Sequence, residues 1–185
     1  MNIRNVVFDV GGVLLEWNPP AVIARLYPDP ATQAVIRRQM FEHADWQEFD
    51  RGGLSYAAAI EHFAKTTGRS TDETRTLIHA TRESLQPIEG TVRLVEQLAA
   101  AGIHLYLLSN MPVSTFEYLI QKHRFFSHFK HLVEKTGIVP AESVFIDDVL
   151  ANVIAARECG FHAIQFSDPA DCRTRLRTYL PEIPP

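Results

Sequence analysis

The chain has 185 residues, of which 46% are hydrophobic, and its 18 Lys and Arg against 22 Asp and Glu give a formal net charge of −4. This length allows one core with a small accessory domain, and the mild negative charge gives no reason to expect a nucleic acid or an anionic membrane as partner. No apolar run is long enough to span a bilayer, and Asn2 and Arg4 lead into a strand pattern without the apolar segment of a signal peptide, so we predict a cytoplasmic protein.

The first predicted strand ends at Asp9. The residues before Asp9 form an apolar, Val-rich run that is too short for a helix, and Gly11 and Gly12 end it, which is typical of a buried parallel strand. Ligands of open parallel sheets bind outside the carboxyl ends of the strands, and the two glycines allow a sharp turn close to a ligand. Asp9 is therefore either a reactive group or an ordinary turn residue, since Asp is common after strands.

Residues 16–86 show helix signals only. A helix-capping Ser, a capping box and a Gly at a helix end mark these segments. We predict helices over Pro19–Arg25, over Ala31–His43, from Ser55 to Gly68, and after the capping box Ser70–Glu73. A helical insert directly behind a strand that bears a reactive carboxylate suggests a lid over the site.

From Pro87 onward, helices alternate with apolar runs that are typical of covered parallel strands. The predicted strands are 103–108, 144–146 and 163–166, and the predicted helices are 90–101, 115–124, 130–136, 151–159 and one that follows Pro169. The fold class is therefore α/β, with a Rossmann-like three-layer core around a parallel sheet. We assign residues 1–15 and 87–185 to this core, and residues 16–86 to a small inserted α-helical cap.

Polar residues follow three of the predicted strands: Asp9, Ser109 with Asn110, and Asp147 with Asp148. Right-handed crossovers between parallel neighbours would bring these strand ends to one edge of the sheet. Three carboxylates crowded there would raise one another's pKa unless a cation lay between them. Mg²⁺ suits such oxygen ligands, so the pattern indicates a magnesium site.

A metal at this edge would also neutralise a phosphate group. The Ser109 hydroxyl and the backbone N–H groups of Val10–Gly12 would hold the phosphate oxygens, and Asp9 would attack phosphorus to form an aspartyl-phosphate. The simpler alternative is that Asp147 and Asp148 only cap the following helix. One Asp suffices for a cap, so the doublet favours the metal site.

Three segments, Phe8–Leu14, Leu107–Asn110 and Phe145–Asn152, carry these residues in this order. In this pattern the chain resembles the haloacid-dehalogenase superfamily of hydrolases, which pair an N-terminal nucleophilic Asp with a later acidic doublet. It is similar to helical-cap members such as the sugar-phosphate phosphatases of the α-D-glucose-1-phosphatase type and the phosphatase-like N-terminal domains of epoxide hydrolases. The resemblance covers essentially the whole chain and implies a Mg²⁺-dependent phosphatase.

The resemblance also implies roles for individual residues. Asp9 would be the nucleophile and a Mg²⁺ ligand, the backbone carbonyl of Gly11 a second ligand, and Asp148 a direct ligand. Asp147 would support these ligands without binding the metal directly. The partner would be a small phosphorylated metabolite such as a sugar phosphate, with the protein a monomer or a homodimer.

The transferring phosphate would be held by Ser109 and Asn110 together with the turn at Gly11 and Gly12, and Asn152 would support the site. These assignments also come from the resemblance.

Two positions depart from the family pattern. Phosphatases of this superfamily usually carry a second Asp two residues after the nucleophile as general acid and base, and here that residue is Gly11. The family's Lys between the second and fourth motifs has no clear counterpart, because Phe129 leads directly to Lys130 where relatives have about twenty more residues. We expect a segment to be missing at that join. Lys130 or Lys135 would otherwise have to serve, although a helix would point both elsewhere.

Two other functions remain open from the sequence: a metal-independent 2-haloacid dehalogenase and a non-catalytic binding or regulatory protein. Substrate recognition would fall to cap residues such as Trp46, Asp50 and Arg51. The alternative is that Trp46 belongs to the core of the cap and that Arg51 is a charged loop residue in solvent. The eight histidines show no metal-ligand spacing, so we assign none of them to chemistry.

Overall fold

The computed structural model describes residues 2–130 and 137–183. They form two compact units: an α/β unit of Met1–Glu16, Pro87–Ser109 and Lys122–Pro185, and a helical unit of Trp17–Gln86 and Asn110–Gln121. The predicted division also separated a helical stretch after the first strand from an α/β remainder. It differs at 110–121, which it had kept with the α/β part. A lid role for the helical unit stays a prediction.

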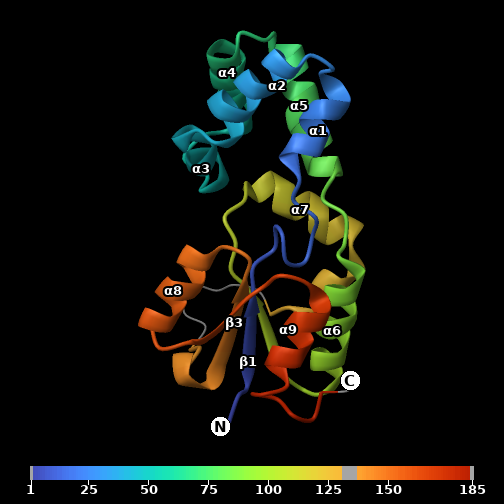
Figure 1. Ribbon diagram of the computed structural model, residues 1–185, viewed down its shortest axis with the longest axis vertical. Helices are drawn as coiled ribbons and strands as arrows, with labels where there is room; N and C mark the ends of the chain where they lie inside the picture. Colours follow the sequence, from blue (N-terminus) through green and yellow to red (C-terminus); the bar gives the residue numbers. More distant parts are fainter. Residues whose placement is uncertain (1, 131–136, 184–185) are drawn as a thin grey trace. The chain divides into compact units, whose positions relative to one another are not determined.

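The α/β unit is built on four parallel strands (Figure 1). The sheet order is β2-β1-β3-β4, and every neighbouring pair is parallel. The strands are β1 (Asn5–Phe8), β2 (His104–Leu107), β3 (Ser143–Asp147) and β4 (His162–Gln165). Each coincides with a run predicted from the sequence, and the parallel sheet is confirmed.

Helices cover both faces of this sheet. Figure 1 shows α8 (Leu150–Glu158) on one side and α6 (Glu89–Ala100) with α9 (Pro169–Leu176) on the other. One row of side chains that are neighbours in the parallel register packs together with Val153 of α8: Val7, Tyr106, Phe145 and Ala163. Because alternate strand residues face opposite sides, the adjacent rows face the other helices. The predicted three-layer, Rossmann-like α/β class is confirmed.

The helical unit contains both predicted and unpredicted elements. Ser55 caps one helix and Gly68 ends it with φ +67°, and Ser70 with Glu73 forms the predicted capping box. The predicted helix 31–43 instead divides into an α-helix and a π-helical turn at Arg37–Phe41. The helices of this unit are α1 (Pro19–Leu26), α2 (Pro30–Ile36), α3 (Ala44–Asp50), α4 (Tyr56–Thr67), α5 (Thr71–Glu83) and α7 (Val113–Lys122).

The core of the helical unit centres on Trp46, which is 7% exposed. Its ring lies 4.5 Å from that of Phe41, 5.6 Å from that of Phe49 and 5.8 Å from that of Phe63, measured between ring centroids. Aromatic pairs at these separations add to the stabilisation that burial alone supplies. Of the two interpretations of Trp46, the structure shows the core position.

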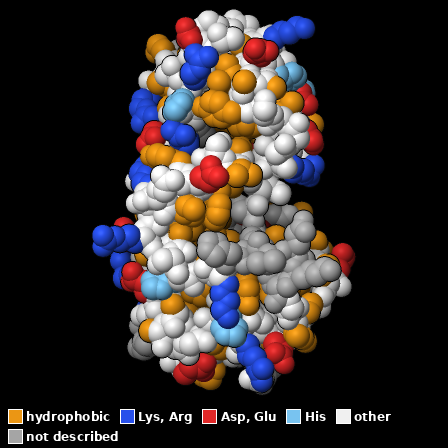
Figure 2. All heavy atoms as spheres, turned by 180° about the vertical axis from the view of Figure 1, so that it is seen from behind, with side chains coloured by type: hydrophobic (Ala, Val, Ile, Leu, Met, Phe, Trp, Pro, Cys, Tyr) orange, Lys and Arg blue, Asp and Glu red, His pale blue; other side chains and the backbone are white. Residues whose placement is uncertain are grey.

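Within the described ranges, no helix is long and apolar enough to cross a membrane. Figure 2 shows basic and acidic side chains scattered over the visible face rather than gathered in one region of a single sign. The cytoplasmic location stays a prediction.

Candidate active site

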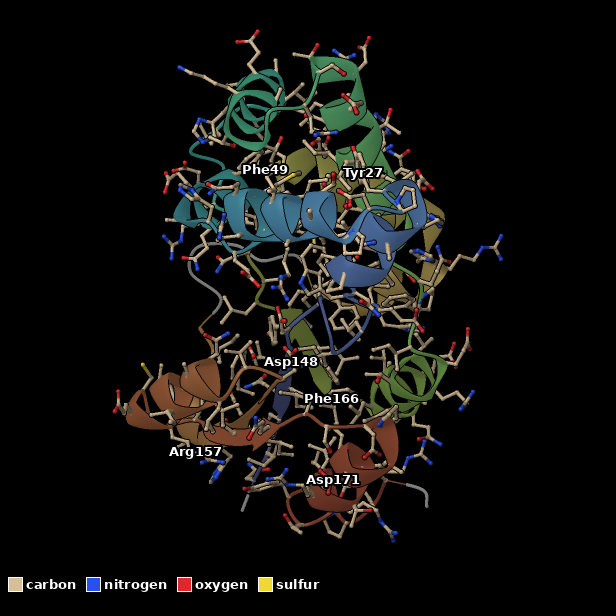
Figure 3. The ribbon with its side chains drawn as sticks, turned by 45° about the horizontal axis from the view of Figure 1, so that its top comes forward. Tyr27, Phe49, Asp148, Arg157, Phe166 and Asp171 are labelled. Carbon is tan, nitrogen blue, oxygen red and sulfur yellow. The ribbon has the colours of Figure 1, made fainter. Side chains whose placement is uncertain are left out.

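Three carboxylates meet at the end of the sheet in the α/β unit. Asp9 directly follows β1, Asp147 ends β3, and Asp148, which is labelled in Figure 3, comes next. Each offers a carboxylate oxygen, and these three atoms lie within 4.8 Å of one another. The cause is the parallel register, which pairs Phe8 with Ile146 and lets the N–H of Asp9 donate to the carbonyl of Ile146 at 2.9 Å. The convergence that the sequence predicts is present.

A tight turn after β1 fits closely around this cluster. The N–H groups of Leu14 and Leu15 both donate to the carbonyl of Val10 at 2.9 Å, and Gly12 has φ +79°. A Cβ on Gly12 would lie 2.5 Å from a carboxylate oxygen of Asp148, closer than real Cβ contacts. Gly12 is therefore required both for the backbone conformation and for the space that the Asp148 carboxylate fills.

The two acids of the doublet have different surroundings. Asp147 is 2% exposed, and its two oxygens accept hydrogen bonds from the N–H of Val149 at 2.8 Å and the side-chain amide of Asn152 at 3.0 Å. Asp148 is exposed to solvent. Asp147 is thus fixed by its neighbours, whereas Asp148 lies against Gly12 and within reach of Asp9 while still exposed, which suits the supporting and ligating roles that the resemblance implies.

Burial and mutual repulsion shape the charges of the cluster. Burial, and secondarily the negative charges of Asp147 and Asp148, raise the pKa of Asp9 to about 7, although hydrogen bonds from the Val10 N–H and the Ser109 hydroxyl oppose the shift. Burial and the charge of Asp147 likewise raise the pKa of Asp148. Over residues 2–130 and 137–183, no Lys or Arg forms an ion pair with these carboxylates.

This donor set fits a hard divalent cation. Carboxylate oxygens without a basic partner are what Mg²⁺ binds in proteins, usually by one or two carboxylates with water completing the shell. A cation between these side chains would remove the repulsion that raises their pKa values.

The predicted phosphate-binding groups are only partly assembled around Asp9. The Ser109 hydroxyl lies beside Asp9 and lowers its pKa. The N–H of Gly12 already donates to the carbonyl of Leu15 at 2.8 Å, which leaves the N–H groups of Val10 and Gly11 as the members of the turn that could donate to a phosphate. Asn110 groups with the helical unit, and its role stays a prediction.

The family's Lys was expected near the join of Phe129 and Lys130, and both of these residues lie within the described part of the chain. Phe129 forms an isolated parallel bridge with Leu105 beside β2, and the N–H of Lys130 donates to the carbonyl of Leu105 at 2.9 Å. This backbone pairing places Phe129 and Lys130 beside β2, and the missing segment that the resemblance led us to expect at this join stays a prediction. Lys130 is exposed. Lys135 and most of the predicted helix 130–136 lie outside the described residues.

The family model of haloacid dehalogenase-like hydrolases matches residues 3–160, which include all three acids. The chain belongs to this family. It is therefore a hydrolase of the haloacid dehalogenase-like type, and the family predicted from its motifs is confirmed.

Two curated relatives extend over nearly the whole chain. The sesquiterpene phosphatase astK of Aspergillus oryzae is 24% identical over 193 residues, which cover 94% of this chain and 95% of that protein. The D-ribitol-5-phosphate phosphatase of Bacteroides thetaiotaomicron is 23% identical, with 96% of this chain and 98% of that protein covered. Similarity to α-D-glucose-1-phosphatase in particular stays a prediction.

Solved structures share the fold. A predicted haloacid dehalogenase-like hydrolase of Porphyromonas gingivalis superposes with a TM-score of 0.72 at 22% identity, covering 95% of this chain and 98% of that one. A variant of a family enzyme from Bacteroides thetaiotaomicron, solved with magnesium and inorganic phosphate, gives a TM-score of 0.67 at 17% identity, with 90% and 95% covered.

Proposed function

We propose that this hydrolase is a Mg²⁺-dependent phosphatase that acts on a small phosphorylated metabolite and forms an aspartyl-phosphate on Asp9. The observation that carries the proposal is the group of three carboxylates, Asp9, Asp147 and Asp148, whose oxygens lie within 4.8 Å without a basic ion-pair partner in the described part of the chain. Such a group is stable only with a cation or a retained proton, and a cation also attracts phosphate.

Asp9, Asp148 and the backbone carbonyl of Gly11 would hold the metal, and Asp147 would keep the loop at Val149 and Asn152 in place through its two hydrogen bonds. When bound, Mg²⁺ would neutralise the phosphate oxygens and keep Asp9 ionised.

Asp9 would then attack phosphorus. One of its carboxylate oxygens forms a bond to phosphorus as the bond from phosphorus to the ester oxygen breaks, and the ester oxygen leaves with the electron pair. Water subsequently hydrolyses the aspartyl-phosphate, which releases inorganic phosphate and restores Asp9. The Ser109 hydroxyl, which lies beside Asp9, would donate to a phosphate oxygen during transfer.

Gly11 has no side chain that can protonate the leaving oxygen, whereas relatives usually carry an Asp there. A positioned general acid contributes about 10²- to 10⁴-fold in rate. Substrates whose leaving group needs little protonation, such as anomeric phosphates, should therefore be favoured.

The relatives support a phosphatase of small molecules. Two full-length relatives are named as phosphatases, one of sesquiterpenes and one of D-ribitol 5-phosphate, and a neighbour of the same fold holds magnesium with inorganic phosphate. A sugar or isoprenoid phosphate is accordingly the substrate class to screen first.

The test measures phosphate released from an aryl phosphate and from a panel of phosphorylated metabolites, with Mg²⁺ and with a chelator. We expect Mg²⁺-dependent turnover that falls on the order of 10³-fold or more in Asp9→Asn, because the nucleophile is lost. Asp168→Asn is the matched control, since Asp168 is a helix cap and Asn caps equally well. Undiminished turnover in Asp9→Asn, or turnover unaffected by the chelator, would refute the proposal.

A further inference from the structure

A second group of three potential metal ligands lies within the helical unit. Its members are His43, which directly precedes α3, Asp45 in the first turn of α3, and His62 in α4. One ring nitrogen of each His and a carboxylate oxygen of Asp45 lie within 4.8 Å of one another. All three side chains belong to the same compact unit, so the group does not depend on how the two units are arranged.

A single oxygen of Asp45 lies between the two rings. It is 3.0 Å from Nδ1 of His43 and 2.6 Å from Nε2 of His62. The N–H of Asp45 donates to the same Nδ1 at 3.3 Å, so this nitrogen acts as an acceptor and cap for α3. Nδ1 of His43 thus faces both the N–H and the carboxylate of Asp45.

The His62 nitrogen supplies a second, independent observation. Nε2 of His62 is covered from solvent and has no hydrogen bond of acceptable geometry, although it lies so close to the Asp45 oxygen. A covered polar atom without a partner is costly unless something else satisfies it. No Lys or Arg forms an ion pair with Asp45 among residues 2–130 and 137–183. Two imidazole nitrogens and one carboxylate oxygen thus converge on one point.

We propose that His43, Asp45 and His62 bind a divalent transition metal, with Zn²⁺ as the ion best matched to two imidazoles and one carboxylate. Zn²⁺ takes His nitrogens and carboxylate oxygens at about 2.0–2.2 Å, which places tetrahedral ligand atoms about 3.4 Å apart. The spacings of 2.6 and 3.0 Å must therefore open by several tenths of an ångström. The side chains are 36–41% exposed and have room to do so.

The chemistry of the ligands separates this site from the acid cluster of the α/β unit. Imidazole suits Zn²⁺, Cu²⁺ and Ni²⁺, whereas Mg²⁺ prefers oxygen ligands. The metal would tie the start of α3 to α4 across the loop 51–55. Because α3 has only seven residues and carries Trp46 of the core, bound metal should stabilise the helical unit.

The binding test uses the full chain, freed of metal and then saturated with Mg²⁺ so that the acid cluster is occupied. Calorimetric titration with Zn²⁺ should show one equivalent bound, both in the unaltered chain and in Asp148→Asn. His43→Gln and His62→Gln should each weaken this binding more than tenfold, since each removes a ligand. His79→Gln, which alters an exposed His of the same unit, is the matched control and should leave it unchanged.

Absence of Zn²⁺ binding, or binding that survives in both His variants but is lost in Asp148→Asn, would overturn the proposal. A measurement on the unaltered chain avoids any folding defect of the variants. Long-range ¹H–¹⁵N correlation spectra should show that Zn²⁺ shifts Nδ1 of His43 and Nε2 of His62 while the ring of His79 stays unchanged. Unshifted resonances of His43 and His62 at saturating Zn²⁺ would overturn it equally.

Discussion

The acid cluster of the α/β unit and the His43–Asp45–His62 group of the helical unit are both close enough to share one ion but differ in chemistry. In both, three ligand atoms lie within 4.8 Å. The acid cluster offers oxygen alone and stands on strands held by parallel ladders, whereas the histidine group offers nitrogen and oxygen on a short helix and its neighbour. The comparison teaches that the donor atoms, not the spacing, decide which ion a site can take.

The two groups also differ in how firmly they are supported. Asp147 is buried and bonded to Val149 and Asn152, while Asp45 and both histidines are more than one-third exposed. The acid cluster therefore holds its charges together at an energetic cost when metal-free, and the histidine group has room to rearrange. The following predictions test this contrast, in order of decreasing expected effect.

The largest effect concerns the stability of the metal-free protein. The pKa of Asp9 is about 7 in the folded chain against an ordinary value of 3.8, so the folded state retains a proton that the unfolded state loses. The contribution of Asp9 to stability should therefore fall as the pH rises from about 4 to about 7, by on the order of 4 kcal/mol, and then level off. Asp9→Asn should lack this contribution and keep those of Asp148 and of Asp50, a residue of the helical unit whose pKa burial also raises to about 7.

Urea unfolding of both proteins across this pH range, in the presence of chelator, checks the prediction. Added Mg²⁺ should restore the stability of the unaltered chain above pH 7 and leave Asp9→Asn nearly unaffected. Parallel stability profiles of the two proteins would show that Asp9 carries no such penalty.

Gly12→Ala should lower turnover and Mg²⁺ affinity by about 100-fold, as expected when a metal ligand is displaced. The new Cβ would meet the Asp148 carboxylate at 2.5 Å, and φ +79° adds backbone strain. Gly68→Ala is the control because Gly68 also has a positive φ but nothing within 4 Å. It should cost about 1 kcal/mol of stability, with turnover unchanged. Equal turnover in the two variants would contradict the close fit of Gly12 against Asp148.

Asn152→Ala should have a smaller effect, about 10-fold on Mg²⁺ affinity. Asn152 donates to Asp147 at 3.0 Å and so acts on the site through that residue. Residues that orient metal ligands typically contribute 10- to 100-fold, and Asp147 keeps its other hydrogen bond from Val149. Calorimetric Mg²⁺ titration measures the change, and an unaltered affinity would show that Asn152 does not position the doublet.

The acid cluster could be anticipated from the sequence because its geometry follows from strand ends. Short Val-rich runs predict parallel strands, and parallel strands bring Asp9 and Asp147 to one edge whatever the details of packing. The hydrogen bond from the Gly12 N–H to the carbonyl of Leu15, by contrast, could not be predicted. It depends on the conformation of the turn between these residues, which the residue pattern does not reveal.

The helical unit was harder to predict. Helix α3 was missed because a His ring nitrogen caps it instead of a usual capping side chain. The periodicity of α7 predicts a helix but does not show which unit the helix packs with. Contacts between side chains decide this, such as the guanidinium of Arg82 4.2 Å from the ring centroid of Tyr118. His43 and His62 meet only through the packing of α3 and α4, so their spacing along the chain carries no signal.

The central claim is that Asp9 and Asp148 share one cation, and anomalous diffraction from crystals soaked in Mn²⁺, a substitute for Mg²⁺, tests it most directly. The account predicts one strong peak about 2.1–2.2 Å from a carboxylate oxygen of each residue, with the Asp147 carboxylate farther from the peak than a direct ligand would be. A peak bound to neither residue, or no peak at this edge of the sheet, would contradict the claim.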